Sequence, residues 1–267
     1  MAQATAALRP ALASFARCNP PQRTAVNLRD PESLDAELAI LQLGDAETGR
    51  GIATLVNWGC HPETLQQANT LLSSDFAHPL RERLESALGG VALFVNGALG
   101  AMVTVSSAGE TFAEAGRIGT ALADAAYGAL RASEEMIETG SLAVATREVR
   151  LPVANDAWRR AVAEGLVERP LEEGELVTEV TAWGLGPATL LSVPGEAQPA
   201  LGRRWKRMMG RHHRFLLGLA NDELGYILRR DDFAEERYRY ERSMSLGPET
   251  GALLTAAVQR VLAAIEG

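Results

Sequence analysis

The chain has 267 residues and a formal net charge of −8 at pH 7, a length that suits one large α/β domain. Its 26 basic residues are outnumbered by 34 acidic ones and are scattered apart from a cluster at 203–214, which argues against a nucleic-acid partner. No apolar run approaches the roughly 20 residues of a membrane-spanning helix, and two cysteines are too few for a disulfide framework. We therefore expect a single soluble domain over 1–267, and the lack of a signal-peptide pattern favours the cytoplasm.

The predicted elements alternate irregularly between helices and strands. Apolar residues at helical spacing predict helices over 2–17, 76–88, 107–132, 156–167, 198–209 and 249–265. Apolar or alternating runs predict strands over 37–43, 52–57, 91–96, 141–151, 175–185, 188–193 and 215–220. The strands 37–43 and 52–57 are expected to form one hairpin, and 175–185 and 188–193 another. Because strict βαβ alternation is absent, we expect an α/β fold in which mixed β-sheet layers are covered by helices.

Two segments carry a further expectation about burial. The uninterrupted apolar run 91–96 has the length expected for a buried strand. The basic residues of 203–214 are expected on a solvated helix face, and contact with phosphate or acidic lipid is the alternative.

His61 lies in a loop, Trp58–Pro62, that follows an apolar strand. Pro62 disfavours helical backbone at His61, so the imidazole is presented at a strand end, where histidines commonly bind metal or move protons. A lone histidine at such a corner more often packs or caps it. Glu196 and Tyr226 each follow another predicted strand, however, and three strand ends would bring three potential ligands to a common edge.

Asp75 and Asn96 flank predicted elements near this loop. Asp75 precedes the helix 76–88 and fits an N-cap, with a position beside the His61 loop as the alternative. Asn96 ends the strand 91–96 and is followed by small residues, which permit close approach of another group but are also selected by tight packing. Both are predicted to support the site rather than to bind metal.

Seven stretches follow one another along the chain: Asn57–Pro62, 74–76, 92–98, Pro194–Glu196, 219–226, Tyr240-Glu241 and 246–248. In residues and in order, they together resemble the catalytic domain of the neutral/alkaline, non-lysosomal ceramidases and their bacterial relatives. The resemblance implies a zinc-dependent amidase of sphingolipid metabolism that hydrolyses an N-acyl, ceramide-like substrate. It also implies zinc binding by His61, Glu196 and Tyr226, a tyrosine near the scissile amide at Tyr240, and an active-site arginine at Arg29. Nitrogen and carboxylate ligands suit zinc, and Tyr240 or Arg29 would stabilise the oxyanion.

The chain also departs from the family pattern. No histidine precedes His61, whereas the family has an upstream His-x-His segment, and Val103 stands where the family has a serine nucleophile. Thr104 and Ser106 fall off the pattern, and the basic segment makes His212 and His213 poor substitutes as ligands. We therefore expect an N-terminally incomplete domain without the C-terminal immunoglobulin-like domain, and weak or partial zinc occupancy.

The alternative function is a catalytically silent or truncated relative that binds a lipid or small molecule without turnover. A structural subunit that docks a partner through its basic helix is a third hypothesis. The family pattern further predicts that Tyr240, and not Tyr238, lies beside the cluster of ligands.

Overall fold

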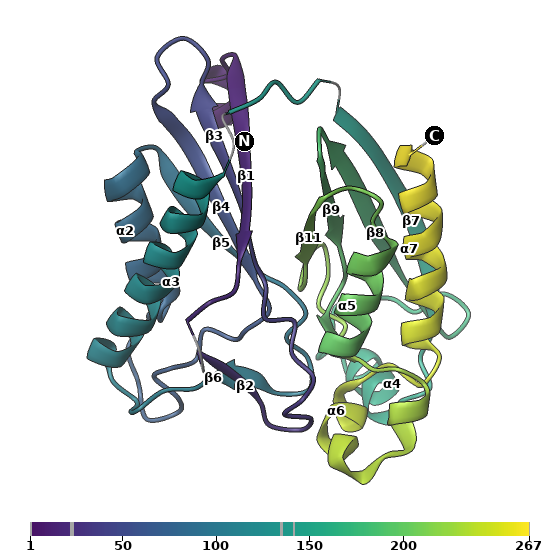
Figure 1. The fold of residues 1–267 in the computed structure, drawn as a ribbon. Helices are drawn as coiled ribbons and strands as arrows, with labels where there is room; N and C mark the ends of the chain where they lie inside the picture. Colours follow the sequence, from purple (N-terminus) through teal and green to yellow (C-terminus); the bar gives the residue numbers. More distant parts are fainter. Residues whose placement is uncertain (1, 22–23, 134–135, 141, 267) are drawn as a thin grey trace.

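A computed structural model of the protein describes residues 2–21, 24–133, 136–140 and 142–266. In this part of the chain, two four-stranded sheets lie between two pairs of helices (Figure 1). The first sheet has the order β1-β3-β4-β5, with β1 (Ala11–Cys18), β3 (Leu38–Asp45), β4 (Gly51–Trp58) and β5 (Val91–Asn96). The second has the order β11-β9-β8-β7, with β7 (Leu142–Pro152), β8 (Glu175–Leu185), β9 (Ala188–Ser192) and β11 (His213–Leu217).

Helices cover the outer face of each sheet. These are α2 (Ala77–Leu88) and α3 (Phe112–Ala132) on the first sheet, and α5 (Pro199–Met208) and α7 (Thr250–Glu266) on the second (Figure 1). Each sheet is mixed, because β4 with β5 and β9 with β11 run parallel while the other neighbours run antiparallel. The predicted α/β class with mixed sheets covered by helices is confirmed.

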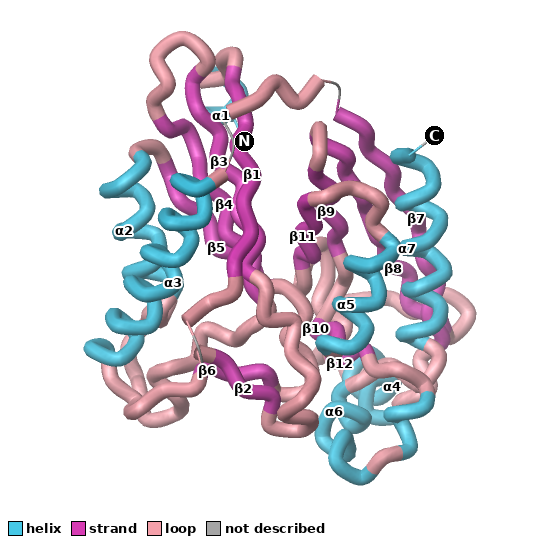
Figure 2. The backbone as a smooth tube through the Cα atoms, in the orientation of Figure 1, coloured by secondary structure: helices cyan, strands magenta, loops and turns pink. Residues whose placement is uncertain are grey.

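Two small sheets lie where β4, β5, β9 and β11 end (Figure 2). One pairs β2 (Ala25–Asn27) with β6 (Val103–Val105), and the other pairs β10 (Glu196–Ala197) in parallel with β12 (Tyr226–Ile227). The remaining short elements are α1 (Ala2–Ala6), α4 (Asp156–Ala163), the 3-10 helices η1 (Asp231–Ala234) and η2 (Glu236–Tyr238), and α6 (Arg239–Met244).

Three apolar clusters fill the spaces between these layers. One lies between α2, α3 and the first sheet, and a second lies between α5, α7 and the second sheet. The third joins the sheets face to face and contains Ala13, Phe15, Ala39, Leu41, Ala188 and Phe215. Neighbouring residues of β3 therefore enter different clusters, Ile40 under the helices and Leu41 between the sheets. The strand is an almost continuous apolar run because both of its faces are covered.

The prediction of a helix over 2–17 is wrong, because most of that segment forms β1. Its residues pair antiparallel with β3, for example Phe15 with Leu41. Ala13 faces the second sheet and Ala16 faces the helices, and both are buried. Small alanines on both faces of a covered strand resemble an alanine-rich helix in composition, while Pro10 separates β1 from the short α1.

The prediction that 91–96 is a buried strand is also wrong. Among the described residues, β5 is the edge strand of its sheet and pairs with β4 alone, and Val91 and Leu93 are 56% and 49% exposed. Leu93 lies opposite Leu55 of β4 and so shares its face, but at the rim of the sheet it is only half covered. An apolar run alone does not distinguish an edge strand from a central one.

The basic segment 203–214 does not form a wholly solvated face. Lys206 is buried, with Nζ 2.8 Å from Asp35 Oδ2, and Arg203 Nη1 donates to Leu34 O at 2.6 Å. These two residues join α5 to the segment that leads into β3. Only Arg204 and Arg207 of this helix match the expected solvent-facing position.

Candidate metal centre

His61 and Glu196 meet at the ends of strands from different sheets. His61 Nε2 lies 3.2 Å from Glu196 Oε2, and the two side chains are 21% and 17% exposed. The His61 N–H donates to Val103 O at 3.2 Å, and the Glu196 N–H donates to Gly225 O at 3.0 Å. Backbone hydrogen bonds to the small sheets therefore fix both residues, and the structure brings these two predicted ligands together.

Tyr226 lies directly opposite Glu196 in the β10–β12 pair. The ring is buried, and its hydroxyl lies 3.7 Å from Met102 Sδ. Burial first, and then the negative charge of Glu196, hold the pKa of Tyr226 well above its usual range. The phenol is therefore neutral at physiological pH.

Tyr240 lies beside Tyr226, with ring centroids 5.9 Å apart and an interplanar angle of 66°. It is 51% exposed, so it lies at the surface of the protein. Tyr238 instead packs into a separate small cluster with Ala101 and Leu228. Of the two tyrosines, the structure places Tyr240 near the predicted ligands.

Carboxylates surround His61. Burial alone would lower the pKa of His61, but the hydrogen bond and charge of Glu196, followed by the charges of Glu63 and Glu223, raise it overall. Burial raises the pKa of Glu223, and so do the negative charges of Glu196 and Asp222. The hydrogen bond from the Gly225 N–H and the charge of His61 lower this pKa by less. Sequence reasoning missed Glu63 and Glu223, although each lies within three residues of a predicted ligand, and a local count of acidic residues would have found them.

Arg29 forms an ion pair with Glu241, a residue to which sequence reasoning assigned no role. Its Nε donates to Glu241 Oε1 at 2.8 Å, and Glu241 is fully buried. The pair ties the segment after β2 to α6, the helix that carries Tyr240. Tyr240 and Glu241 are adjacent in sequence, so the motif that indicated the tyrosine also contained this carboxylate.

The N-cap role predicted for Asp75 is wrong, and the alternative position beside the His61 loop is the one observed. Asp75 Oδ2 accepts from the Leu65 N–H at 2.9 Å, and Oδ1 accepts from the Phe76 N–H at 2.7 Å. The helix begins later, at Ala77, because a turn precedes it. The hydrogen bond from the Ala77 N–H to Ser74 O closes this turn. Asp75 therefore fixes the loop that follows His61.

Asn96 joins neighbouring segments through its backbone. Its carbonyl oxygen accepts from Gly218 N at 2.9 Å and from Asn57 Nδ2 at 3.1 Å, which holds the end of β5 against the segment after β11. The side-chain Oδ1 is buried without a hydrogen-bond partner among the described residues.

Val103 O accepts the backbone hydrogen bond from the His61 N–H, so this residue lies next to the candidate site. Its side chain is fully buried and aliphatic. His213 begins β11 at the end opposite to Leu217 and Gly218. The structure therefore does not place this histidine with His61.

The donor set fits part of a zinc site. An imidazole nitrogen and a carboxylate oxygen are ligands that zinc accepts, and Tyr226 adds a phenol beside them. Among the described residues, no third His, Cys, Asp or Glu joins these groups to form a cluster able to hold a metal ion. His61, Glu196 and Tyr226 therefore offer donor types that zinc accepts, without completing such a cluster.

These features define a four-layer α/β protein with a polar cluster where strands of both sheets end. The fold matches neutral ceramidase from Pseudomonas aeruginosa with a TM-score of 0.78 and 20% identity, over 99% of this chain and 54% of that chain. A ceramidase solved in complex with a molecule denoted C2 matches with a TM-score of 0.78 and 18% identity, over 99% of this chain and 54% of that chain. The chain therefore has the fold of about half of a neutral ceramidase, and the predicted structural resemblance is confirmed.

The sequence itself matches no protein family model and no curated protein. Among the helices of the described residues, none is long and apolar enough to cross a membrane.

Proposed function

We propose that the chain contains part of a zinc-dependent amide hydrolase centre that acts on an N-acyl, sphingolipid-like substrate. The observation that carries this proposal is the 3.2 Å approach of His61 Nε2 to Glu196 Oε2, with Tyr226 opposite Glu196. The donor types support the metal, and the likeness to neutral ceramidase supports the substrate class.

His61, Glu196 and Tyr226 would hold the zinc ion. When bound, zinc supplies a Lewis acid that polarises a carbonyl and lowers the pKa of a bound water to about 7. The negative charges of Glu63 and Glu223 near His61 attract a cation. Zinc affinity is nevertheless expected to be weak, because the neutral Tyr226 phenol must lose its proton to bind well, and burial beside Glu196 opposes that loss.

Tyr240 is the residue best placed to assist the reaction directly. Its half-exposed phenol can donate a hydrogen bond to the amide oxygen as negative charge develops there, which is the role of an oxyanion donor. The Arg29–Glu241 pair, at 2.8 Å, fixes the helix that presents this phenol. We infer that Arg29 acts by positioning Tyr240, while the direct oxyanion role predicted from the family remains a prediction.

The second candidate function is binding of the N-acyl lipid without turnover. Two observations favour it. Val103, an aliphatic residue, lies beside His61, and the resemblance places the family's nucleophile at this position. In the described segments, no third acidic, histidine or cysteine ligand joins the cluster.

Hydrolysis of a short-chain N-acylsphingosine, with and without zinc and a chelator, separates the two functions. We expect slow, zinc-dependent release of the fatty acid. Tyr240→Phe should lower the rate by about 100-fold while zinc content stays the same. Tyr238→Phe is the matched control, because Tyr238 is buried elsewhere, and it should retain the rate. Binding without chelator-sensitive release would establish the second function, and absence of both would refute the proposal.

A further inference from the structure

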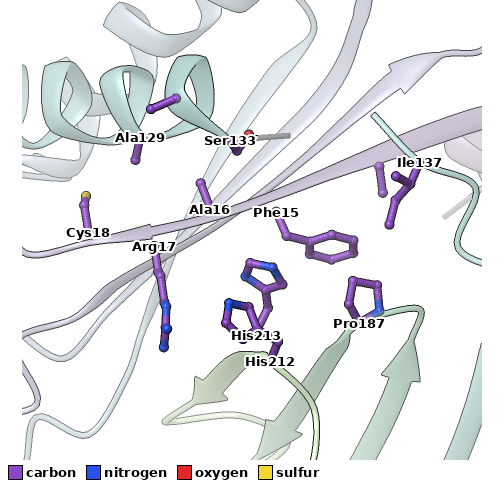
Figure 3. Close-up of a pocket in the computed structure, with 12 residues that line it drawn as sticks. Phe15, Ala16, Arg17, Cys18, Ala129, Ser133, Ile137, Pro187, His212 and His213 are labelled. Carbon is purple, nitrogen blue, oxygen red and sulfur yellow. The ribbon is translucent and has the colours of Figure 1, made fainter. Parts of the chain in front are cut away.

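A cavity of about 710 Å³ lies away from the His61–Glu196 pair, between β1, the end of α3 and the start of β11 (Figure 3). This volume falls in the range of roughly 300 to 1,000 Å³ that is typical of small-molecule sites. The cavity forms because β1 and α3 meet through alanines, whose small side chains leave the space between them unfilled.

One part of the cavity wall is apolar. It consists of Phe15, Ala16, Ala129, Ala132, Ile137 and Pro187. Ile137 is 40% exposed, so this wall includes apolar surface in contact with water, and a ligand that covered it would gain free energy from its burial.

The other part of the wall carries nitrogen groups from β1 and β11. The His213 ring stacks on Phe15, with centroids 5.2 Å apart and an interplanar angle of 24°, and His212 meets His213 edge-on at 4.8 Å. His213 Nδ1 is buried and has no hydrogen-bond partner among the described residues. A buried nitrogen of this kind normally has a partner.

Arg17 adds a positive charge to the same wall. Its side chain is 48% exposed, and its neighbouring carboxylate, Glu37, lies 3.7 Å away. Glu37 is also 3.8 Å from Lys206, so its charge is shared between two cations. A half-exposed ion pair of this length contributes little, which leaves the Arg17 guanidinium able to accept a second anionic partner.

We propose that this cavity binds an organic monocarboxylate with an apolar body. The carboxylate pairs with Arg17 and the His213 imidazole, since guanidinium and carboxylate match in geometry as well as charge. The body covers Phe15, Ala129 and Ile137. A metal ion does not fit, because no three His, Cys, Asp or Glu residues gather here within the described chain. The site does not depend on the function proposed for His61 and Glu196.

Isothermal titration of the full chain with octanoate and with 1-octanol tests the proposal. Octanoate should bind with one site per chain, and octanol at least tenfold more weakly because it lacks the charge. Arg17→Gln should weaken octanoate binding by about tenfold. Arg83→Gln is the matched control: Arg83 is another half-exposed arginine with one carboxylate partner, Asp124 at 2.9 Å. Its replacement should leave octanoate affinity unchanged.

A second pair of variants tests the location. Ala132→Trp fills the cavity from an exposed position on the last turn of α3, so it should abolish octanoate binding while far-ultraviolet circular dichroism stays unchanged. Ala113→Trp, at the exposed first turn of the same helix, should bind octanoate normally. Equal affinity for octanoate and octanol, equal effects of Arg17→Gln and Arg83→Gln, or full binding by Ala132→Trp would each overturn the proposal.

Discussion

Asn57, four residues before His61, joins the two large sheets at the level of the candidate site. It is buried, and its Nδ2 donates to Val95 O at 3.1 Å, Asn96 O at 3.1 Å and Leu216 O at 2.8 Å. Its Oδ1 accepts from Leu216 N at 3.0 Å. One amide therefore fixes the end of β5 and the end of β11 relative to each other, and with them the segments that follow both strands.

Replacing Asn57 should destabilise the whole fold. Asn57→Leu leaves a buried N–H and buried carbonyl groups without partners, so we expect the free energy of unfolding to fall by about 2 to 4 kcal/mol. Urea denaturation measures this change. Asn69→Leu is the control, because Asn69 bonds only within an exposed loop, and it should change stability by less than about 0.5 kcal/mol. Similar effects of the two substitutions would contradict the structural role of Asn57.

His213 makes stability depend on pH in a predictable direction. Burial, followed by the positive charges of His212 and Arg17, lowers the pKa of His213 below its ordinary value of 6.5. The unfolded chain therefore binds this proton more readily than the folded chain. Stability that is present above pH 6.5 is lost as the pH falls from there through the lower pKa of the folded chain.

His213→Phe removes this titration but keeps a ring to stack on Phe15. Between about pH 8 and about pH 5.5, the free energy of unfolding should fall less in this variant than in the wild type. Urea titrations at the two pH values check this expectation. His78→Phe, at an exposed histidine of α2, should keep the wild-type dependence. If the free energy of unfolding of His213→Phe falls with pH as much as that of the wild type, the assignment of this pH dependence to His213 is refuted.

Among the helices, α5 depends on a buried charge rather than on a solvated basic face. Lys206 Nζ lies 2.8 Å from Asp35 Oδ2, and both side chains are less than a tenth exposed. Lys206→Met should lower the free energy of unfolding by about 3 to 5 kcal/mol, because Asp35 then becomes an unpaired buried charge. Arg207→Met, at an exposed position of the same helix, should be nearly neutral in thermal unfolding.

The double variant Lys206→Met/Asp35→Leu distinguishes the contribution of the ion pair to stability from the cost of leaving one buried charge unpaired. With both charges removed, most of the lost stability should return, because well-packed apolar residues often replace a buried ion pair without cost. A double variant less stable than Lys206→Met would contradict this account of α5.

Periodicity predicted most elements of this fold, and it failed where one strand has both faces covered by small residues. The helices and strands predicted after residue 36 lie close to observed ones, since their apolar spacing is regular, whereas the short β6, β10, β12, η1, η2 and α6 were not predicted. β1 was mistaken for a helix because it has small apolar residues on both faces, with Ala13 toward the second sheet and Ala16 toward the helices. The edge position of β5 was missed because its exposure depends on which strands neighbour it, and the sequence of the strand does not contain that information.

At the scale of the whole molecule, the candidate site combines residues from both halves of the chain. His61 follows a strand of the first sheet, while Glu196 and Tyr226 follow strands of the second. Their proximity depends on how the two sheets pack, which no local pattern encodes. The residue types and the ceramidase resemblance indicated His61, Glu196 and Tyr226, but the pairing of Arg29 with Glu241 arises only from the tertiary arrangement.

Zinc bound per chain, measured by equilibrium dialysis followed by elemental analysis, tests the proposed metal centre most directly. His61 and His78 provide matched histidine–glutamate pairs, 3.2 Å to Glu196 and 3.3 Å to Glu82. We predict that the wild type binds less than one zinc per chain at about micromolar free zinc, that His61→Ala and Glu196→Gln lose this zinc, and that His78→Ala retains it. The same zinc content in His61→Ala as in the wild type would contradict the proposed centre, and firm binding of one zinc per chain would contradict its expected weak affinity.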